Sequence, residues 1–326
     1  MKNIVKNRNF GLIIGIGAIL LLAWILVPQF FKPSTLVSTI RNNCVFAFLA
    51  CAEVLAIMAG NIDLSGPAIL AAAGCLTINI HIANPELSIV VLVLIAIVFG
   101  LAIGAINGFL VMYLGMVPMI ATLATTYILR GTAFYLTSQG ITYYAAFFQE
   151  EYRKIGIPKT LGIHNVIWCA IVVFVITGIL INRSTIGRRL LAIGTNRESA
   201  RISGINVQMI GTIGYMISGA ICGLAGVCWG ANYTSVDSYC ADGYEMTAIC
   251  ICLLGGAGDG EARISGLVLS TVLIAFMSAF ISMLPGMSTW SDGIKGIMIV
   301  LAIALNAWTH KSTQKKELQE RERRMA

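Results

Sequence analysis

The chain has 326 residues, 57% of them hydrophobic and only 11% charged, and its formal net charge is +7. About 25% of the residues in a soluble domain are charged, so this composition excludes a soluble globule and indicates a membrane protein with several spans. The basic excess gathers at the ends of apolar runs, as membrane topology requires, which argues against nucleic-acid binding.

The apolar runs predict an all-α bundle of about ten transmembrane helices, forming a single domain over residues 1–326. A hydrocarbon core roughly 30 Å thick needs about 20 apolar residues per helix, and most runs approach that length. The eighth run is too short to cross unaided, and almost no loop joins the second run to the third. The ten runs cover residues 10–27, 41–59, 63–81, 87–113, 117–137, 164–182, 207–230, 245–257, 263–284 and 287–308.

The first run follows MKNIVKNRNF and is predicted to be a retained span rather than a cleaved signal. It continues into VPQFF, where no small-residue cleavage site occurs. With the N-terminus inside, ten crossings also leave the tail, residues 309–326, in the cytoplasm. Lysine and arginine support this orientation, because 15 of the 22 fall in predicted inside segments.

Glycines at a spacing of four residues predict close helix contacts. Gly100, Gly104 and Gly108 have this spacing in the fourth run, and Gly219 and Gly223 have it in the seventh. Small residues let helix backbones approach closely in lipid, and we expect these contacts inside one bundle rather than at a dedicated dimer face.

Polar side chains inside the runs are candidates for the solute pathway, because polar groups in a membrane are costly and usually functional. The sparse charges, including Glu245 at the start of the eighth run, argue against a proton or sodium relay and favour a neutral, polar cargo. The threonines could equally form interhelical hydrogen bonds worth about 0.6 kcal/mol each. The candidates are Glu53, Asn107, Thr122, Thr125, Thr126 and Arg130.

Two predicted loops stand out. The outer loop, residues 138–164, is long and rich in aromatic residues, so we expect either a short surface helix or a simple lid over the bundle. The cytoplasmic loop, residues 183–206, carries five arginines in NRSTIGRR and LAIGTNRESARISGI. They would anchor the orientation, and guanidinium groups can also bind carboxylates of a partner protein.

Motifs of catalysis and of nucleotide hydrolysis are missing from the sequence. GxxxxGK[ST], GxSxG and HExxH do not occur. GGAGDGEAR at 255–263 has no preceding strand and is interpreted as a tight cytoplasmic turn. The nine cysteines include no CxxC pair, and the three histidines have no metal-ligand spacing. We therefore expect a protein that is not an enzyme and uses no cofactor or metal.

Five motifs occur in order along the chain. The loop pattern AxGxNxxSARxSGI begins at Ala192. The other blocks are GNIDLS at 60–65, GAINGFLV at 104–111, ATLATTYILRG at 121–131 and CLLGGAGDGEARISG at 252–266. Together they resemble the ribose-type ABC importer permeases, within the branched-chain amino acid/ribose permease family, and the loop pattern is similar to the cytoplasmic loop of that family. The resemblance extends over about residues 36–308.

This resemblance implies a type II importer permease in the bacterial inner membrane, moving a small neutral sugar or sugar-like solute. It also implies three partners: a cytoplasmic ABC ATPase, an extracytoplasmic solute-binding protein and a second permease subunit, identical or homologous. A secondary transporter or facilitator, and the permease of an amino-acid ABC importer, stay open as alternatives. The residues implied in coupling to the ATPase are Arg188, Arg189, Gly194, Asn196, Arg197, Ala200, Arg201 and Gly204.

Overall fold

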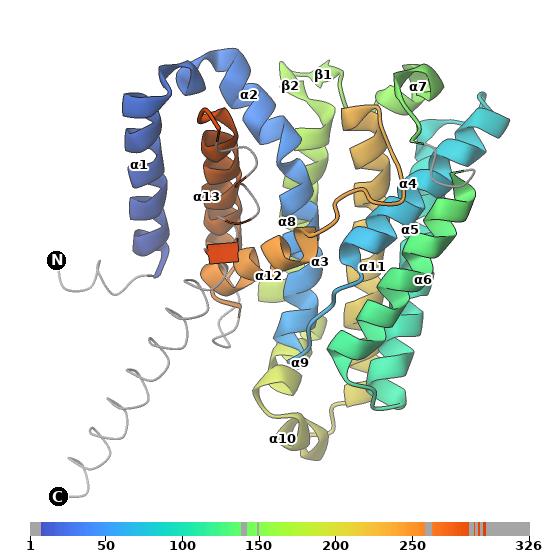
Figure 1. The fold of residues 1–326 in the computed structure, drawn as a ribbon. Helices are drawn as coiled ribbons and strands as arrows, with labels where there is room; N and C mark the ends of the chain where they lie inside the picture. Colours follow the sequence, from blue (N-terminus) through green and yellow to red (C-terminus); the bar gives the residue numbers. More distant parts are fainter. Residues whose placement is uncertain are drawn as a thin grey trace, which may run out of the picture.

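Long helices standing side by side make up most of the protein, as Figure 1 shows for the computed structural model. The structure describes residues 8–137, 142–148, 150–257 and 263–286, with Trp290, Gly293, Gly296 and Ile297. Apart from these last four residues, the predicted tenth span lies outside the described residues. So do the tail, 309–326, and most of the predicted turn at 255–263.

The described helices confirm the first nine predicted runs to within about three residues at most ends. They are α1 (Arg8–Leu26), α3 (Cys44–Met58), α4 (Gly66–Ala83), α5 (Ile89–Gly108), α6 (Pro118–Leu136), α8 (Asn165–Arg183), α11 (Val207–Tyr233), α12 (Tyr244–Gly255) and α13 (Ile264–Met283). Seven helical segments of the described chain are long and apolar enough to cross a membrane. Of the other two, α6 has 19 residues but is less apolar, and α12 has only 12.

Shorter elements join these helices. Before α3 come the 3-10 turn η1 (Pro28–Phe31) and α2 (Pro33–Asn42), and α5 ends in a π-helical turn, η2 (Phe109–Tyr113). The predicted outer loop contains η3 (Ala145–Phe147), α7 (Glu150–Arg153) and an antiparallel hairpin of β1 (Lys159–Thr160) and β2 (Ile163–His164). Between α8 and α11 lie α9 (Thr185–Thr195) and α10 (Arg197–Ile202).

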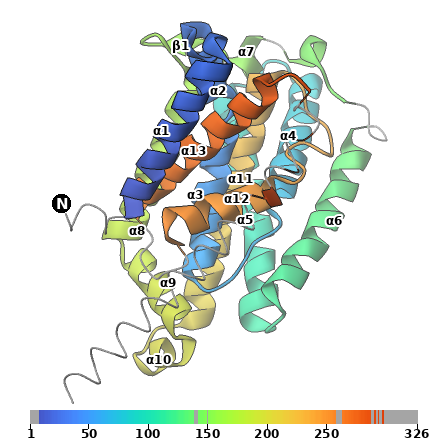
Figure 2. The same cartoon turned by 60° about the vertical axis from the view of Figure 1, so that its left-hand side comes forward.

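The elements divide between two ends of the bundle. In Figure 1, α9 and α10 lie at the lower end, and β1, β2 and α7 lie at the upper end. Helix α1 starts on the side toward α9 and α10 and ends on the side of the hairpin. Figure 2 shows α1 at one edge, alongside α13. The two short helices and the hairpin therefore lie at opposite ends of the bundle.

Helix α3 lies at the centre, where every one of its residues except Ile57 is buried. A helix that is apolar on all sides is expected to be surrounded by protein or lipid rather than to face water. In contrast, most of α1 is exposed, and among its residues 9–26 only Leu12 and Ala23 are buried. The core therefore sits around α3, α4 and α11, and α1 packs against α13 at the edge of the bundle.

Helices α5 and α11 touch through their backbones. A Cβ atom added to Gly100 would lie 2.0 Å from the carbonyl oxygen of Gly219, and one added to Gly219 would lie 2.1 Å from that of Gly100. At Gly104 it would lie 2.2 Å from the carbonyl oxygen of Tyr215. No side chain larger than hydrogen fits at these positions, so the glycine spacing marks a contact within the chain, as predicted.

Candidate functional site

Capping side chains start the two short helices between α8 and α11. Ser184 Oγ accepts a hydrogen bond from the Gly187 N–H at 3.0 Å, at the start of α9. Asn196 Oδ1 accepts one from the Ser199 N–H at 2.8 Å, at the start of α10. Serine and asparagine are favoured at this position because their oxygens satisfy an otherwise unpaired N–H. Asn196 therefore fixes the break between α9 and α10.

The α9–α10 segment, residues 184–204, has one buried apolar side and one exposed basic side. Leu190, Ile193 and Ala200 are buried against the bundle. The exposed arginines in and beside the segment are Arg183, Arg188, Arg189, Arg197 and Arg201. Within the described part of the chain, Arg189 and Arg201 form no salt bridge. The apolar side anchors the segment, and the cationic side is left for water or a partner.

Two positions of the segment require glycine, one because of its backbone conformation and one because of its close packing. Gly204 follows α10 with φ +80°, in the left-handed region that glycine adopts without strain. Gly194 lies so close to the end of α3 that an added Cβ would stand 2.2 Å from the carbonyl oxygen of Met58. It would stand 3.0 Å from the backbone nitrogen of Gly60. Helix α9 is thus seated directly on the turn that follows α3.

That turn, residues 60–65 of the GNIDLS motif, is held by a chain of hydrogen bonds. Asp63 Oδ1 accepts from the backbone N–H of Ser65 at 2.9 Å and from its hydroxyl at 2.5 Å. Asn107 Nδ2 on α5 donates to Ser65 Oγ at 2.8 Å, and Thr125 Oγ1 on α6 donates to Asn107 Oδ1 at 2.6 Å. The turn is therefore tied to two helices that follow it in sequence.

Further bonds link the turn to α3, α6 and α11. Glu53 Oε1 accepts from the Asp63 N–H at 3.3 Å, and Ser218 Oγ donates to Asp63 Oδ2 at 3.5 Å. The Leu64 N–H donates to Thr122 Oγ1 at 3.1 Å, and Thr126 Oγ1 donates to the Leu64 carbonyl oxygen at 3.0 Å. Buried polar groups need such partners, since each unpaired one costs free energy in a low-dielectric interior.

Arg130 lies apart from this cluster and binds the loop before α12. Its Nη1 donates to the carbonyl oxygens of Ser238 at 2.6 Å and Cys240 at 2.9 Å. Its Nη2 lies 3.2 Å from Asp242 Oδ1, and the guanidinium carbon lies 6.0 Å from the centre of the Tyr239 ring. Arg130 therefore fastens the 234–243 loop to α6.

Five of the six predicted pathway residues are consequently brought together around one turn, and the sixth, Arg130, is elsewhere. Each of the five is used in a hydrogen bond to the turn or to a neighbour in the cluster. This matches the interhelical role that the sequence left open for the threonines, and their assignment to a solute pathway stays a prediction.

Sequence reasoning missed three members of the cluster: Asp63, Ser65 and Ser218. Asp63 and Ser65 stand in a recognised motif at the very start of the 63–81 run, where a polar residue is expected at the end of a span rather than in the core. Ser218 sits in a run of small residues that offered no signal. Asp63 is 3% exposed, so the cluster contains two buried carboxyl groups, Glu53 and Asp63, where the sequence pointed to one.

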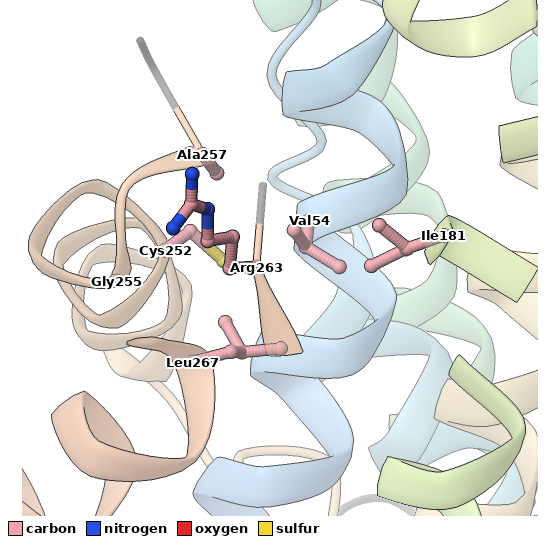
Figure 3. Close-up of a pocket in the computed structure, with 7 residues that line it drawn as sticks. All are labelled: Val54, Ile181, Cys252, Gly255, Ala257, Arg263 and Leu267. Atoms are coloured by element: carbon pink, nitrogen blue, oxygen red, sulfur yellow. The ribbon is translucent and has the colours of Figure 1, made fainter. Parts of the chain in front are cut away.

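The gap drawn in Figure 3 lies between α3, α8, α12 and α13, and it offers no room to a water molecule. Its lining is apolar apart from Arg263. The residues around it are Val54, Ile181, Cys252, Gly255, Ala257, Arg263 and Leu267. A sugar-sized solute cannot occupy this gap.

Comparison with known proteins decides the family. Residues 35–303 match the family described as the permease component of the branched-chain amino acid transport system. The chain belongs to this permease family. As a member it is a multi-pass membrane transport subunit and not an enzyme. The match extends over α2 to α13, so it includes both the α9–α10 segment and the 60–65 turn.

Individual relatives are named as sugar permeases. The permease is 30% identical over 288 residues to the ribose import permease protein RbsC of Escherichia coli K12. The matched region covers 86% of this chain and 88% of the relative. It is 29% identical to RbsC of Bacillus subtilis 168, over 92% of both chains. It is 27% identical to the L-arabinose transport system permease protein AraH of Escherichia coli K12, over 93% and 92%. No solved structure matches the permease.

Proposed function

We propose that this permease is the membrane-spanning subunit of an ATP-driven importer in the bacterial inner membrane. In this proposal it translocates a small neutral sugar or sugar-like solute that an external binding protein delivers. The relatives named for ribose and L-arabinose support the class of cargo. The energy comes from a cytoplasmic ABC ATPase, and a second permease subunit, identical or homologous, completes the membrane part.

The observation that carries the proposal is the α9–α10 segment. It is anchored by Leu190, Ile193 and Ala200 while its arginines face outward. A partner with carboxylates would pair with Arg188, Arg189, Arg197 and Arg201, because a guanidinium group binds a carboxylate through two parallel hydrogen bonds. In the proposal this segment docks on the ATPase, and Gly194, Asn196, Ala200 and Gly204 give it its shape.

The arrangement of the helices supports an orientation with this segment in the cytoplasm. The segment lies at the end where α1 starts, opposite the β1–β2 hairpin. The excess of lysine and arginine in the same set of loops favours the cytoplasmic side for that end. The N-terminus and the tail would then both be cytoplasmic, and the outer loop would face the binding protein.

Buried charge supports a neutral cargo. Glu53 and Asp63 are the buried acidic residues of the described chain. Their carboxylate oxygens accept hydrogen bonds from backbone N–H groups of the 60–65 turn, so they are already used within the protein. A charged solute crossing a low-dielectric path would need an opposite charge facing it, since burying an unpaired ion is costly.

Competitive uptake tests the proposal. Cells would carry the permease with its ATPase and binding protein, sought first among neighbouring genes, and labelled pentoses would compete with hexoses and amino acids. We expect a neutral sugar to compete best and uptake to stop when the ATPase is inactivated. The family description includes amino-acid systems, so an amino acid that wins would favour that alternative. Uptake that persists without the ATPase would favour a secondary transporter.

A further inference from the structure

The 60–65 turn is in backbone contact with the α9–α10 segment. An added Cβ on Gly60 would lie 3.4 Å from the Cα of Gly194, and one on Gly194 would lie 2.2 Å from the Met58 carbonyl oxygen. Side chains can change rotamer to absorb a small displacement, but two backbones in contact cannot. A movement of α9 toward the bundle therefore displaces the turn.

The opposite side of the turn is bonded to α6 through the main chain of Leu64. Its N–H donates to Thr122 Oγ1 at 3.1 Å, and its carbonyl oxygen accepts from Thr126 Oγ1 at 3.0 Å. The two threonines lie one turn apart on α6, so two successive turns of α6 hydrogen-bond the main chain of Leu64. The chain from Ser65 through Asn107 to Thr125 adds an indirect link to the same helix.

A second route joins the same two regions through Met112. Arg197 Nη2 lies 3.4 Å from the Met112 sulfur, and Asn61 Nδ2 lies 3.7 Å from it. Met112 belongs to the π-helical turn η2, and π-helical turns occur often at functional sites. The thioether is a weak acceptor, so this route positions Arg197 and the turn without fixing them rigidly.

We propose that the 60–65 turn is the positioning element that carries a displacement of α9 to α6 during transport. Gly194 is its contact with the ATPase-facing segment, and Thr122 and Thr126 are its contacts with α6. This proposal rests on the proposed function, since it needs an ATPase that moves α9. It assigns to Thr122 and Thr126 a mechanical role in place of a solute-lining one.

The test measures solute imported per ATP hydrolysed by the complete transporter in proteoliposomes. Thr126→Val removes one bond to Leu64, and Thr122→Val with Thr126→Val removes both. We expect this ratio to fall about threefold for one lost bond and about eightfold for two, while hydrolysis and assembly with the ATPase persist. Gly194→Ala disturbs the other side of the turn and is expected to lower the ratio at least as far as the double substitution.

Matched controls separate the link from general disturbance. Thr132→Val lies on the same helix, and among the described residues the Thr132 hydroxyl donates only to the Ile128 carbonyl oxygen of α6 itself, at 2.8 Å. Gly17→Ala places a Cβ in open space on α1. Both are expected to keep the wild-type ratio. If the double variant does not assemble, the single Thr126→Val decides by the same ratio.

The outcomes distinguish this proposal from the function on which it rests. Suppose that the wild type needs ATP and that Gly194→Ala and the threonine substitutions leave the ratio unchanged. The role of the turn is then overturned, and the proposed function stands. A wild type that imports solute without ATP overturns the proposed function, and the role of the turn with it. If the ratio falls equally in Thr132→Val, the role of the turn is also overturned, because the loss would then follow from any disturbance of α6.

Discussion

Replacing Arg130 by glutamine should release the 234–243 loop while leaving the bundle folded. The guanidinium donates to two carbonyl oxygens, at 2.6 and 2.9 Å, and its side chain is only 10% exposed. Hydrogen bonds from a charged group contribute about 1.5–3 kcal/mol each, so losing two costs about 3 kcal/mol locally even at the lower figure. Glutamine is too short to bridge both carbonyls.

The ion pair to Asp242 adds little to this sum. The Asp242 side chain is 68% exposed, and exposed pairs contribute about 0–1 kcal/mol. Asp242→Asn is therefore a matched control that removes the charge but keeps the carbonyl contacts. A local loss of about 3 kcal/mol raises the opening constant of the loop about 150-fold, since about 1.4 kcal/mol corresponds to a factor of ten.

Hydrogen exchange in detergent or nanodiscs measures this opening. The Val236 N–H, which donates to the Tyr143 carbonyl oxygen at 3.0 Å, reports on the loop. We expect its exchange to accelerate strongly in Arg130→Gln and by less than about fivefold in Asp242→Asn. Equal exchange in wild type and Arg130→Gln would refute the reasoning. So would equal acceleration in both variants, because the ion pair would then be the main restraint.

Three further outcomes are expected. Gly219→Ala should destabilise the protein by about 1–3 kcal/mol in chemical unfolding, because the new Cβ would meet the Gly100 carbonyl oxygen at 2.1 Å. Gly17→Ala, whose Cβ meets nothing within 4 Å, should leave the stability unchanged. Equal unfolding midpoints for the two variants would count against the close contact. Arg197→Glu with Arg201→Glu should abolish ATP-dependent uptake and co-purification of the ATPase without changing membrane insertion, and unaltered uptake would reduce these arginines to topological anchors. The purified permease alone should hydrolyse no ATP, and robust turnover by the homogeneous chain would contradict its assignment as a transport subunit.

The helices were predictable because hydropathy acts over windows as long as the helices themselves. Runs such as 87–113 and 207–230 end within a few residues of α5 with η2 and of α11. Glycine spacing also predicted that two of the helices make close contacts within the bundle, since a repeat of four residues leaves a smooth stripe on one side of a helix; it did not say that the two would contact each other. These signals are local, and the sequence alone contains them.

The contents of the buried cluster were not predictable to the same degree. Ser218 and Asp63 are 155 residues apart, and neither residue type at its position announces the other. Hydropathy puts Asp63 at the first position of the 63–81 run, where a polar residue is expected to reach the surface, whereas the fold buries it at 3% exposed. The seat of Gly194 on Met58 likewise depends on how α9 returns to the bundle, which no periodicity encodes.

The touching backbones of α5 and α11 restrict how this permease can change shape. Close approaches along the pair, at Gly100, Gly104, Gly108 and Gly223, leave no clearance for sliding, because a shift of half a turn would drive side chains into the facing backbone. Any conformational change during transport is therefore expected to move the two helices together as one rigid body. Movement of this pair relative to other helices is then expected at contacts made by side chains, whose rotamers can change.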